Sequence, residues 1–123
     1  MSGKILPGII DTAMADVYEE NLKYAVKVLE AKGMVGLIEP ISRDVVPNYF
    51  MNSFETGQQQ LSLCKLLIFL FNESNFYLIS AVEIIKKIDS KSLKLQLDVF
   101  HLQLLKGNLT KNITELLPHT GKY

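Results

Sequence analysis

Two acidic residues and one histidine are the side chains of this sequence best placed to do chemistry. Glu39 ends the apolar run Met34–Glu39, and Asp98 ends Leu93–Asp98, in which leucines alternate with polar residues. His101 follows Asp98 at a spacing of three residues. Parallel α/β sheets gather their functional groups at the carboxyl ends of the strands. The pattern therefore predicts a site of carboxylate and imidazole groups at that edge of a sheet.

Each of these residues also has a plainer interpretation, because an Asp and a His three residues apart are a weak motif. Asp98 could cap a helix at the end of an edge strand, with His101 in a surface turn. Glu39 could be a solvated carboxylate at a strand end. The spacing alone leaves both interpretations open.

The elements that would position these residues follow from hydrophobic periodicity. A helix is predicted over residues 12–32, with Asp11 or Thr12 as its cap and Gly33 just past its end. Its apolar stripe consists of Tyr18, Leu22, Ala25, Val26 and Leu29. Pro40 ends the following strand, and residues 40–52 form either a loop over a pocket or a plain surface loop.

The C-terminal third of the chain predicts a strand and a last helix. Leu93–Asp98 has the period of a strand. Asn108 can cap the helix that follows, Pro118 ends it, and Pro118–Tyr123 is predicted to be a terminal loop without a strand. The apolar stripe of this helix consists of Leu109, Ile113, Leu116 and Leu117. Alternating helices and strands predict an α/β fold with a parallel sheet, and two strands are too few to complete one.

The segment Gly57–Ser80 interrupts this order. Asn52–Thr56, with Ser53 as cap, and Ala81–Ile88 would form one continuous amphipathic helix if the segment were removed. We therefore interpret residues 57–80 as a 24-residue insertion, from a retained intron or a gene-model artefact, with a genuine helical insertion as the alternative. Its apolar run Leu61–Phe71 contains Lys65 and is too short to cross a bilayer.

Composition sets the remaining bounds. The chain has 123 residues, which suits one small domain, and its formal net charge of zero gives no electrostatic footprint for nucleic acid or an anionic membrane. Cys64 is the one cysteine, so an internal disulfide is excluded. The N-terminus lacks the pattern of a secretory signal, so a cytoplasmic location without membrane association is expected.

Five blocks of sequence, in order, resemble hydroxypyruvate isomerase, a member of the xylose-isomerase-like TIM barrels. They are Glu19-Glu-Asn-Leu-Lys-Tyr-Ala, Gly36-Leu-Ile-Glu-Pro-Ile, Val46-Pro-Asn-Tyr-Phe, Leu95-Gln-Leu-Asp-Val-Phe-His-Leu-Gln and Gly107-Asn-Leu-Thr-Lys-Asn-Ile. The resemblance covers nearly all of the chain outside Gly57–Ser80. It implies an α/β fragment of a TIM (β/α)8 barrel, with roughly the fourth and fifth strands and their flanking helices.

The resemblance also implies roles for the three candidate residues. Glu39 and Asp98 would bind a divalent metal, Mg²⁺ or Mn²⁺, Glu39 would be the proton donor and acceptor, and His101 would contact the substrate. The implied reaction of glyoxylate metabolism interconverts hydroxypyruvate and tartronate semialdehyde, through an enediolate stabilised by the metal. Such an enzyme is an intramolecular oxidoreductase of the aldose–ketose type, acting on a small hydroxy-keto acid.

The same resemblance implies that part of the site is missing. A TIM barrel needs eight βα units, and later metal ligands, including a second acid–base glutamate, have no counterpart here. We therefore expect weak or absent metal binding and no activity from this chain alone. The alternative is a non-catalytic interaction module that exposes a sheet edge and an apolar helix, which leaves self-association through the sheet edges open.

Overall fold

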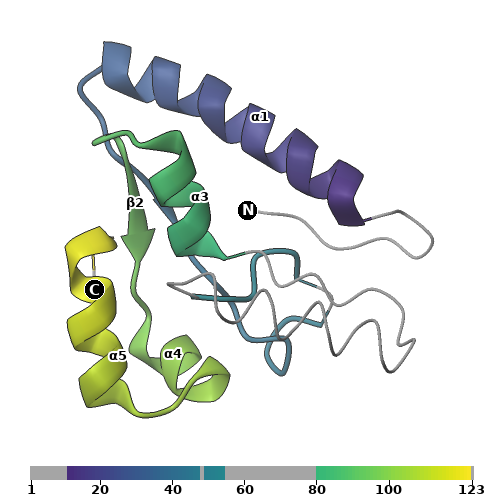
Figure 1. Ribbon diagram of the computed structural model, residues 1–123, viewed down its shortest axis with the longest axis vertical. Coiled ribbons are helices and arrows are strands. Elements are labelled where there is room, and N and C mark those ends of the chain that lie inside the picture. The colour runs from purple at the N-terminus through teal and green to yellow at the C-terminus, as the bar shows by residue number, and fades with distance from the viewer. Residues whose placement is uncertain (1–10, 48, 55–79, 123) are drawn as a thin grey trace.

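The computed structural model describes residues 11–47, 49–54 and 80–122 of the chain (Figure 1). Most of the predicted insertion, including Cys64 and Leu61–Phe71, lies outside these residues. The elements are α1 (Asp11–Ala31), β1 (Gly36–Ile38), α3 (Ala81–Ile88), β2 (Leu93–Gln96), α4 (Val99–Leu105), α5 (Leu109–Leu116), the 3₁₀ helix η1 (Leu117–His119) and β3 (Thr120–Lys122).

The three described strands form one parallel sheet in the order β1-β2-β3. Leu37 pairs with Lys94 and Ile38 with Leu95, so β2 is the central strand. The α/β prediction with a parallel sheet is confirmed. The prediction of a strandless terminus was wrong: Thr120–Lys122 pairs with β2, although its sequence carries no apolar alternation. Asp98 accordingly follows a central strand and not an edge strand.

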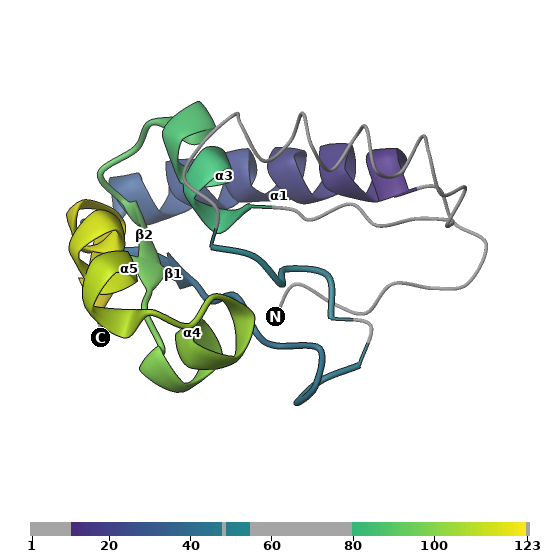
Figure 2. The same cartoon turned by 60° about the horizontal axis from the view of Figure 1, so that its bottom comes forward.

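One face of the sheet is packed against helices. Leu93, Leu95 and Leu97 are at most 2% exposed, and they form one core cluster with Ile38 of β1. Helices α1 and α3 lie side by side over this face, and contribute Val26 from α1 and Ile84 and Ile85 from α3 to the cluster (Figure 2). The period of two in β2 and the helical stripe of α1 therefore serve the same core.

An ion cluster joins α1 to α3 at the edge of this core. The Glu19 carboxylate accepts hydrogen bonds from the ammonium groups of Lys23, on the same helix, and of Lys87 on α3. These two cations lower the pKa of Glu19, and the Glu19 carboxylate raises the pKa of Lys87. The Glu19 side chain is only 14% exposed, so the cluster lies against the packed surface.

The two predicted terminal helices are confirmed, but their caps differ in detail. Gly33 has φ +63°, the left-handed conformation that favours glycine after a helix. Asn108 precedes α5 with φ 38°, yet its side chain makes no capping hydrogen bond. The buried Asn112 instead donates from Nδ2 to the Gly107 carbonyl at 2.7 Å, which ties the first turn of α5 to the preceding glycine.

The prediction that Ser53 caps the helix before the insertion was wrong. Ser53 forms an isolated parallel bridge with Ser80, and α3 begins at Ala81 with Ser80 as its cap. The Ser80 hydroxyl accepts a hydrogen bond from the Glu83 N–H at 3.2 Å. The backbone N–H of Ala81 donates to the Ser53 carbonyl at 3.1 Å, so the two residues that flank residues 54–80 are in direct contact.

The other face of the sheet is open among the described residues. Leu37 is 37% exposed, and Lys94 and Gln96 on the same face of β2 are partly exposed. A Cβ atom at Gly121 would lie 2.7 Å from the Lys94 Cβ and 2.9 Å from the Leu37 Cδ2, so the side chains of Lys94 and Leu37 leave no room for a side chain at this position of β3. None of the helices in the described part of the chain is long and apolar enough to cross a membrane.

Candidate metal centre

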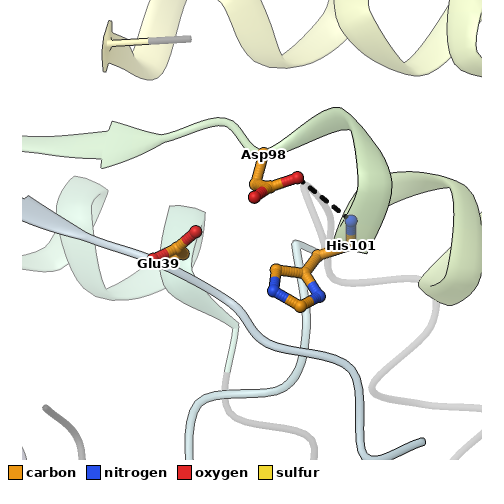
Figure 3. A group of neighbouring side chains, drawn as sticks. All are labelled: Glu39, Asp98 and His101. Atoms are coloured by element: carbon orange, nitrogen blue, oxygen red, sulfur yellow. Dashed lines mark hydrogen bonds between the residues drawn. The ribbon is translucent and has the colours of Figure 1, made fainter. Parts of the chain in front are cut away.

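Glu39 stands directly after β1, where the chain leaves the sheet. Pro40, which follows it, is fully buried and cannot donate a backbone hydrogen bond, so the strand cannot continue here. The strand is Gly36–Ile38, shorter than the predicted Met34–Glu39. Pairing of Ile38 with Leu95 brings Glu39 level with the end of β2. The carboxylate is partly exposed, and Figure 3 shows it directed toward the same space as Asp98 and His101.

Asp98 both caps a helix and contributes to the candidate site. Its Oδ1 accepts hydrogen bonds from the backbone N–H groups of Phe100 at 2.8 Å and His101 at 3.3 Å, which makes it the N-cap of α4. The plainer interpretation of Asp98 as a cap is therefore correct. It does not exclude the functional interpretation. Both of these hydrogen bonds are accepted by Oδ1, so Oδ2 can still bind a ligand.

His101 lies in the first turn of α4 and not in a surface turn. It is 9% exposed, and its Nδ1 accepts a hydrogen bond from the backbone N–H of Ser42 at an N···N distance of 3.4 Å. The Phe100 ring meets the imidazole edge-on, with 5.4 Å between ring centroids. The cap at Asp98, the Ser42 amide and the Phe100 ring together fix the place of the imidazole.

The three candidate residues come together at the carboxyl ends of β1 and β2. One ligand atom from each of Glu39, Asp98 and His101 lies within 4.8 Å of the other two (Figure 3). Two carboxylate oxygens and an imidazole are suitable donors for a divalent cation, and the carboxylates favour a hard ion such as Mg²⁺ or Mn²⁺. Three donors are fewer than the six that an octahedral ion takes, so this cluster alone would not complete a coordination shell.

The segment after Glu39 folds back on itself to support this site. The Ile41 N–H donates to the Met51 carbonyl at 3.0 Å, and the Ser42 carbonyl accepts from the N–H groups of Val45 and Val46. The Ser42 hydroxyl accepts from the Asp44 N–H at 3.2 Å, and Ser42 is 1% exposed. The sequence left open whether residues 40–52 form a loop over a pocket or a plain surface loop. In the structure this segment reaches the site through the buried Ser42, which no sequence signal singled out.

Comparison with known proteins confirms the resemblance to hydroxypyruvate isomerase. The chain is 36% identical over 126 residues to a protein of Danio rerio and 34% identical over 126 residues to one of Homo sapiens, whose names provisionally mark them as hydroxypyruvate isomerases. Both alignments cover 98% of this chain and 37% of the relative. A 2-oxo-tetronate isomerase of Cupriavidus necator is 27% identical over 110 residues, 89% of this chain and 33% of that protein. The chain thus spans about a third of the length of these relatives.

A solved structure supports the fold independently. A crystal structure of an AP endonuclease of family 2 from Brucella melitensis matches with a TM-score of 0.67 over 93% of this chain and 35% of that one. It is a xylose-isomerase-like TIM barrel, and the 24% sequence identity supports a likeness of fold alone. No protein-family model matches the chain.

Proposed function

We propose that this chain is the section of a xylose-isomerase-like barrel that contributes two ligands and a substrate contact to a metal-assisted isomerase. Glu39 and Asp98 would be the ligands, and His101 the contact. The observation that carries this proposal is the meeting of Glu39, Asp98 and His101 within 4.8 Å at the carboxyl ends of neighbouring parallel strands. The similarity to proteins named as isomerases supports the same reaction class.

The reaction proposed is the interconversion of hydroxypyruvate and tartronate semialdehyde. Glu39 takes a proton from C3 of hydroxypyruvate, which leaves an enediolate, and returns a proton to C2, while a hydroxyl proton moves between the two oxygens. A divalent metal such as Mg²⁺ or Mn²⁺, held by Glu39 and Asp98, would supply positive charge for the developing oxyanion. We propose further that this reaction is part of glyoxylate metabolism and that it takes place in the cytoplasm.

The described sheet corresponds in this proposal to the fourth, fifth and sixth barrel strands. The remaining donors would come from other strands, since the two carboxylates Glu39 and Asp98 do not fill the six positions of an octahedral ion. A carboxylate that must both bind a metal and move protons needs a complete, fixed environment. We therefore expect the 123 residues alone to bind metal weakly and to turn over little substrate.

Incubation with hydroxypyruvate and Mg²⁺ or Mn²⁺ tests the proposal, with tartronate semialdehyde measured as product. The assay is run on the chain alone and on a chimera in which it replaces the matching third of a full-length relative. The chimera is expected to be active and to lose at least about 10²-fold in rate with Glu39→Gln, the range for loss of general acid–base catalysis. The exposed Glu20→Gln, on α1, is the matched control. Full activity of the Glu39→Gln chimera would contradict the role of Glu39.

A non-catalytic interaction module is the second candidate function. The observation in its favour is exposed apolar surface at the sheet: Met34 is 54%, Val35 55% and Leu37 37% exposed, beside the edge strand β1. Edge strands with apolar surface readily pair with another chain. Size-exclusion chromatography with light scattering distinguishes the two candidates, because a cooperatively melting monomer argues against self-association.

A further inference from the structure

The hydrogen bond between the Ser42 backbone and His101 determines which ring nitrogen of the histidine carries a proton. A backbone N–H can only donate, so the Nδ1 that receives it must present a lone pair. In a neutral imidazole the proton then resides on Nε2. Figure 3 shows the ring lying beside both carboxylates, so Nε2 is the nitrogen left for Glu39, Asp98 or a bound molecule.

Histidines that bind metals show the opposite arrangement. A ligating imidazole offers one nitrogen to the ion and donates its other N–H to a carboxylate, a carbonyl or water. His101 accepts where such a histidine would donate. With Nδ1 occupied by the Ser42 amide, Nε2 carries a hydrogen and has no lone pair for an ion.

The Ser42 amide is well held for this task. Ser42 is 1% exposed. Its hydroxyl accepts a hydrogen bond from the Asp44 N–H, and its carbonyl accepts hydrogen bonds from the N–H groups of Val45 and Val46. The 3.4 Å contact is long, but it is buried, where a hydrogen bond is electrostatically stronger than in water. On the other side of the imidazole, the Asp98 carboxylate fixes the first turn of α4 through the His101 N–H.

We propose that the backbone N–H of Ser42 is a positioning group that holds His101 as the Nε2–H tautomer, so that His101 is a hydrogen-bond donor to an oxygen atom and not a metal ligand. The oxygen would belong to the substrate, and in this respect alone the inference rests on the proposed function. The three-residue cluster then divides into two carboxylate ligands and one neutral donor.

Nuclear magnetic resonance of the imidazole nitrogens tests the tautomer without substrate or metal. The chain has two histidines, so a ¹⁵N-labelled His119→Gln variant contains His101 alone. About two pH units above the ordinary histidine pKa of roughly 6.5, we expect a protonated Nε2 and an unprotonated Nδ1. A proton on Nδ1 would overturn the proposal, whether or not the isomerase assay succeeds.

Two variants at position 42 assign the effect to the backbone. Ser42→Ala keeps the N–H and removes the hydroxyl, so the pure Nε2–H tautomer should persist. Ser42→Pro removes the N–H, so averaged shifts of both ring nitrogens are expected. An unchanged tautomer in a folded Ser42→Pro chain would show that the amide does not set it.

Hydrogen exchange of the Ser42 amide gives a test that leaves residue 42 intact. His101→Asn keeps an acceptor oxygen on Cγ, near the place of Nδ1, whereas His101→Leu has no acceptor. We expect about tenfold faster exchange in His101→Leu than in the parent chain and in His101→Asn, the loss of one hydrogen bond. Equal exchange in all three chains would overturn the proposal even if Ser42→Pro fails to fold.

Discussion

At Asp98 one carboxylate caps a helix through one oxygen and leaves its other oxygen available to a ligand. Oδ1 caps α4, and Oδ2 can meet a ligand beside Glu39 and His101. Capping by a carboxylate fixes the side chain before any ion arrives, which lowers the entropy cost of binding. The structural and functional interpretations that the sequence left open are therefore compatible.

Two substitutions of Asp98 separate capping from ligand binding. Asp98→Asn keeps a capping oxygen and removes the charge, so we expect nearly unchanged stability and at least tenfold weaker Mn²⁺ binding. Asp98→Ala removes both, and should also lower the free energy of unfolding by about 0.5–2 kcal/mol. Urea unfolding measures the free energy of unfolding. The relaxation of water protons by Mn²⁺ measures Mn²⁺ binding. Equal destabilisation by both variants would contradict the capping role.

The residues of the site differ in how far the sequence predicted them. Glu39, Asp98 and His101 are chemically distinctive and stand at strand ends, and the structure brings them together. Their roles in binding and catalysis remain predictions. Ser42 escaped notice because its contribution comes from a backbone N–H, which every residue except proline possesses.

Among the elements, α1 and α3 are joined by an ion cluster whose charges depend on pH. The folded-state pKa of Glu19 is lowered by its hydrogen bond with Lys23, the largest cause, and by its hydrogen bond with Lys87, the next largest. A lowered carboxyl pKa contributes stability above the unfolded-state value, about 4.3 for glutamate, and this contribution is lost as the pH falls through the folded-state value.

A comparison of Glu19→Gln with the parent chain tests this dependence. At neutral pH the variant should melt at a lower temperature, because it loses the charge that joins the two helices. The difference should shrink as the pH falls from about 4.3 through the lower folded-state pKa of Glu19, below which the parent side chain is also neutral. The exposed Glu20→Gln serves as control and should show neither effect. A gap that stays constant with pH would rule out the charge as its cause.

Element prediction succeeded where apolar residues repeat and failed where elements are short. Helices α1 and α5 and strand β2 carry clear periods, because one side of each faces the core, whereas β1 was predicted from an apolar run. Strand β3 is Thr120-Gly121-Lys122, which contains no apolar residue, and its place depends on pairing with β2. Helix α4 has seven residues, and Val99, Phe100 and Leu104 are exposed, so its sequence lacks an amphipathic stripe.

For the whole molecule, the contact between Ser53 and Ala81 bears on the predicted insertion. Residues 54–80 separate the two, yet the Ala81 N–H donates to the Ser53 carbonyl at 3.1 Å. Removal of residues 57–80 would leave three residues between them, so this hydrogen bond would acquire the i to i−4 spacing of an α-helix. The interpretation of residues 57–80 as an insertion stays a prediction, but this geometry favours it.

Deletion of residues 57–80 is therefore expected to preserve the fold and lengthen α3. Shortening the chain between Ser53 and Ala81 about ninefold should stabilise the fold by about 2 kcal/mol in closure entropy. Ser53 would then stand at the N-cap position in place of the deleted Ser80, so no loss of a cap is subtracted from this gain. Urea unfolding and helical circular dichroism measure the result. Deletion of residues 58–80, which keeps Gly57 and disturbs the spacing, is the matched control; equal helicity in both would contradict the proposed continuity.

Lys94 limits what can cover the open face of the sheet. Its backbone lies in the central strand, between Leu37 on β1 and the closely packed Gly121 on β3. An ammonium group enclosed without a partner costs several kcal/mol. A layer of purely apolar side chains, like the one over the opposite face, would therefore bind unfavourably here. A polypeptide that closes over this face must bring an acidic side chain to the level of Lys94, or leave a path for water. The charge of Lys94 therefore limits which chains can bind over this face. A candidate sequence can be checked for a suitably placed acidic residue before binding is measured.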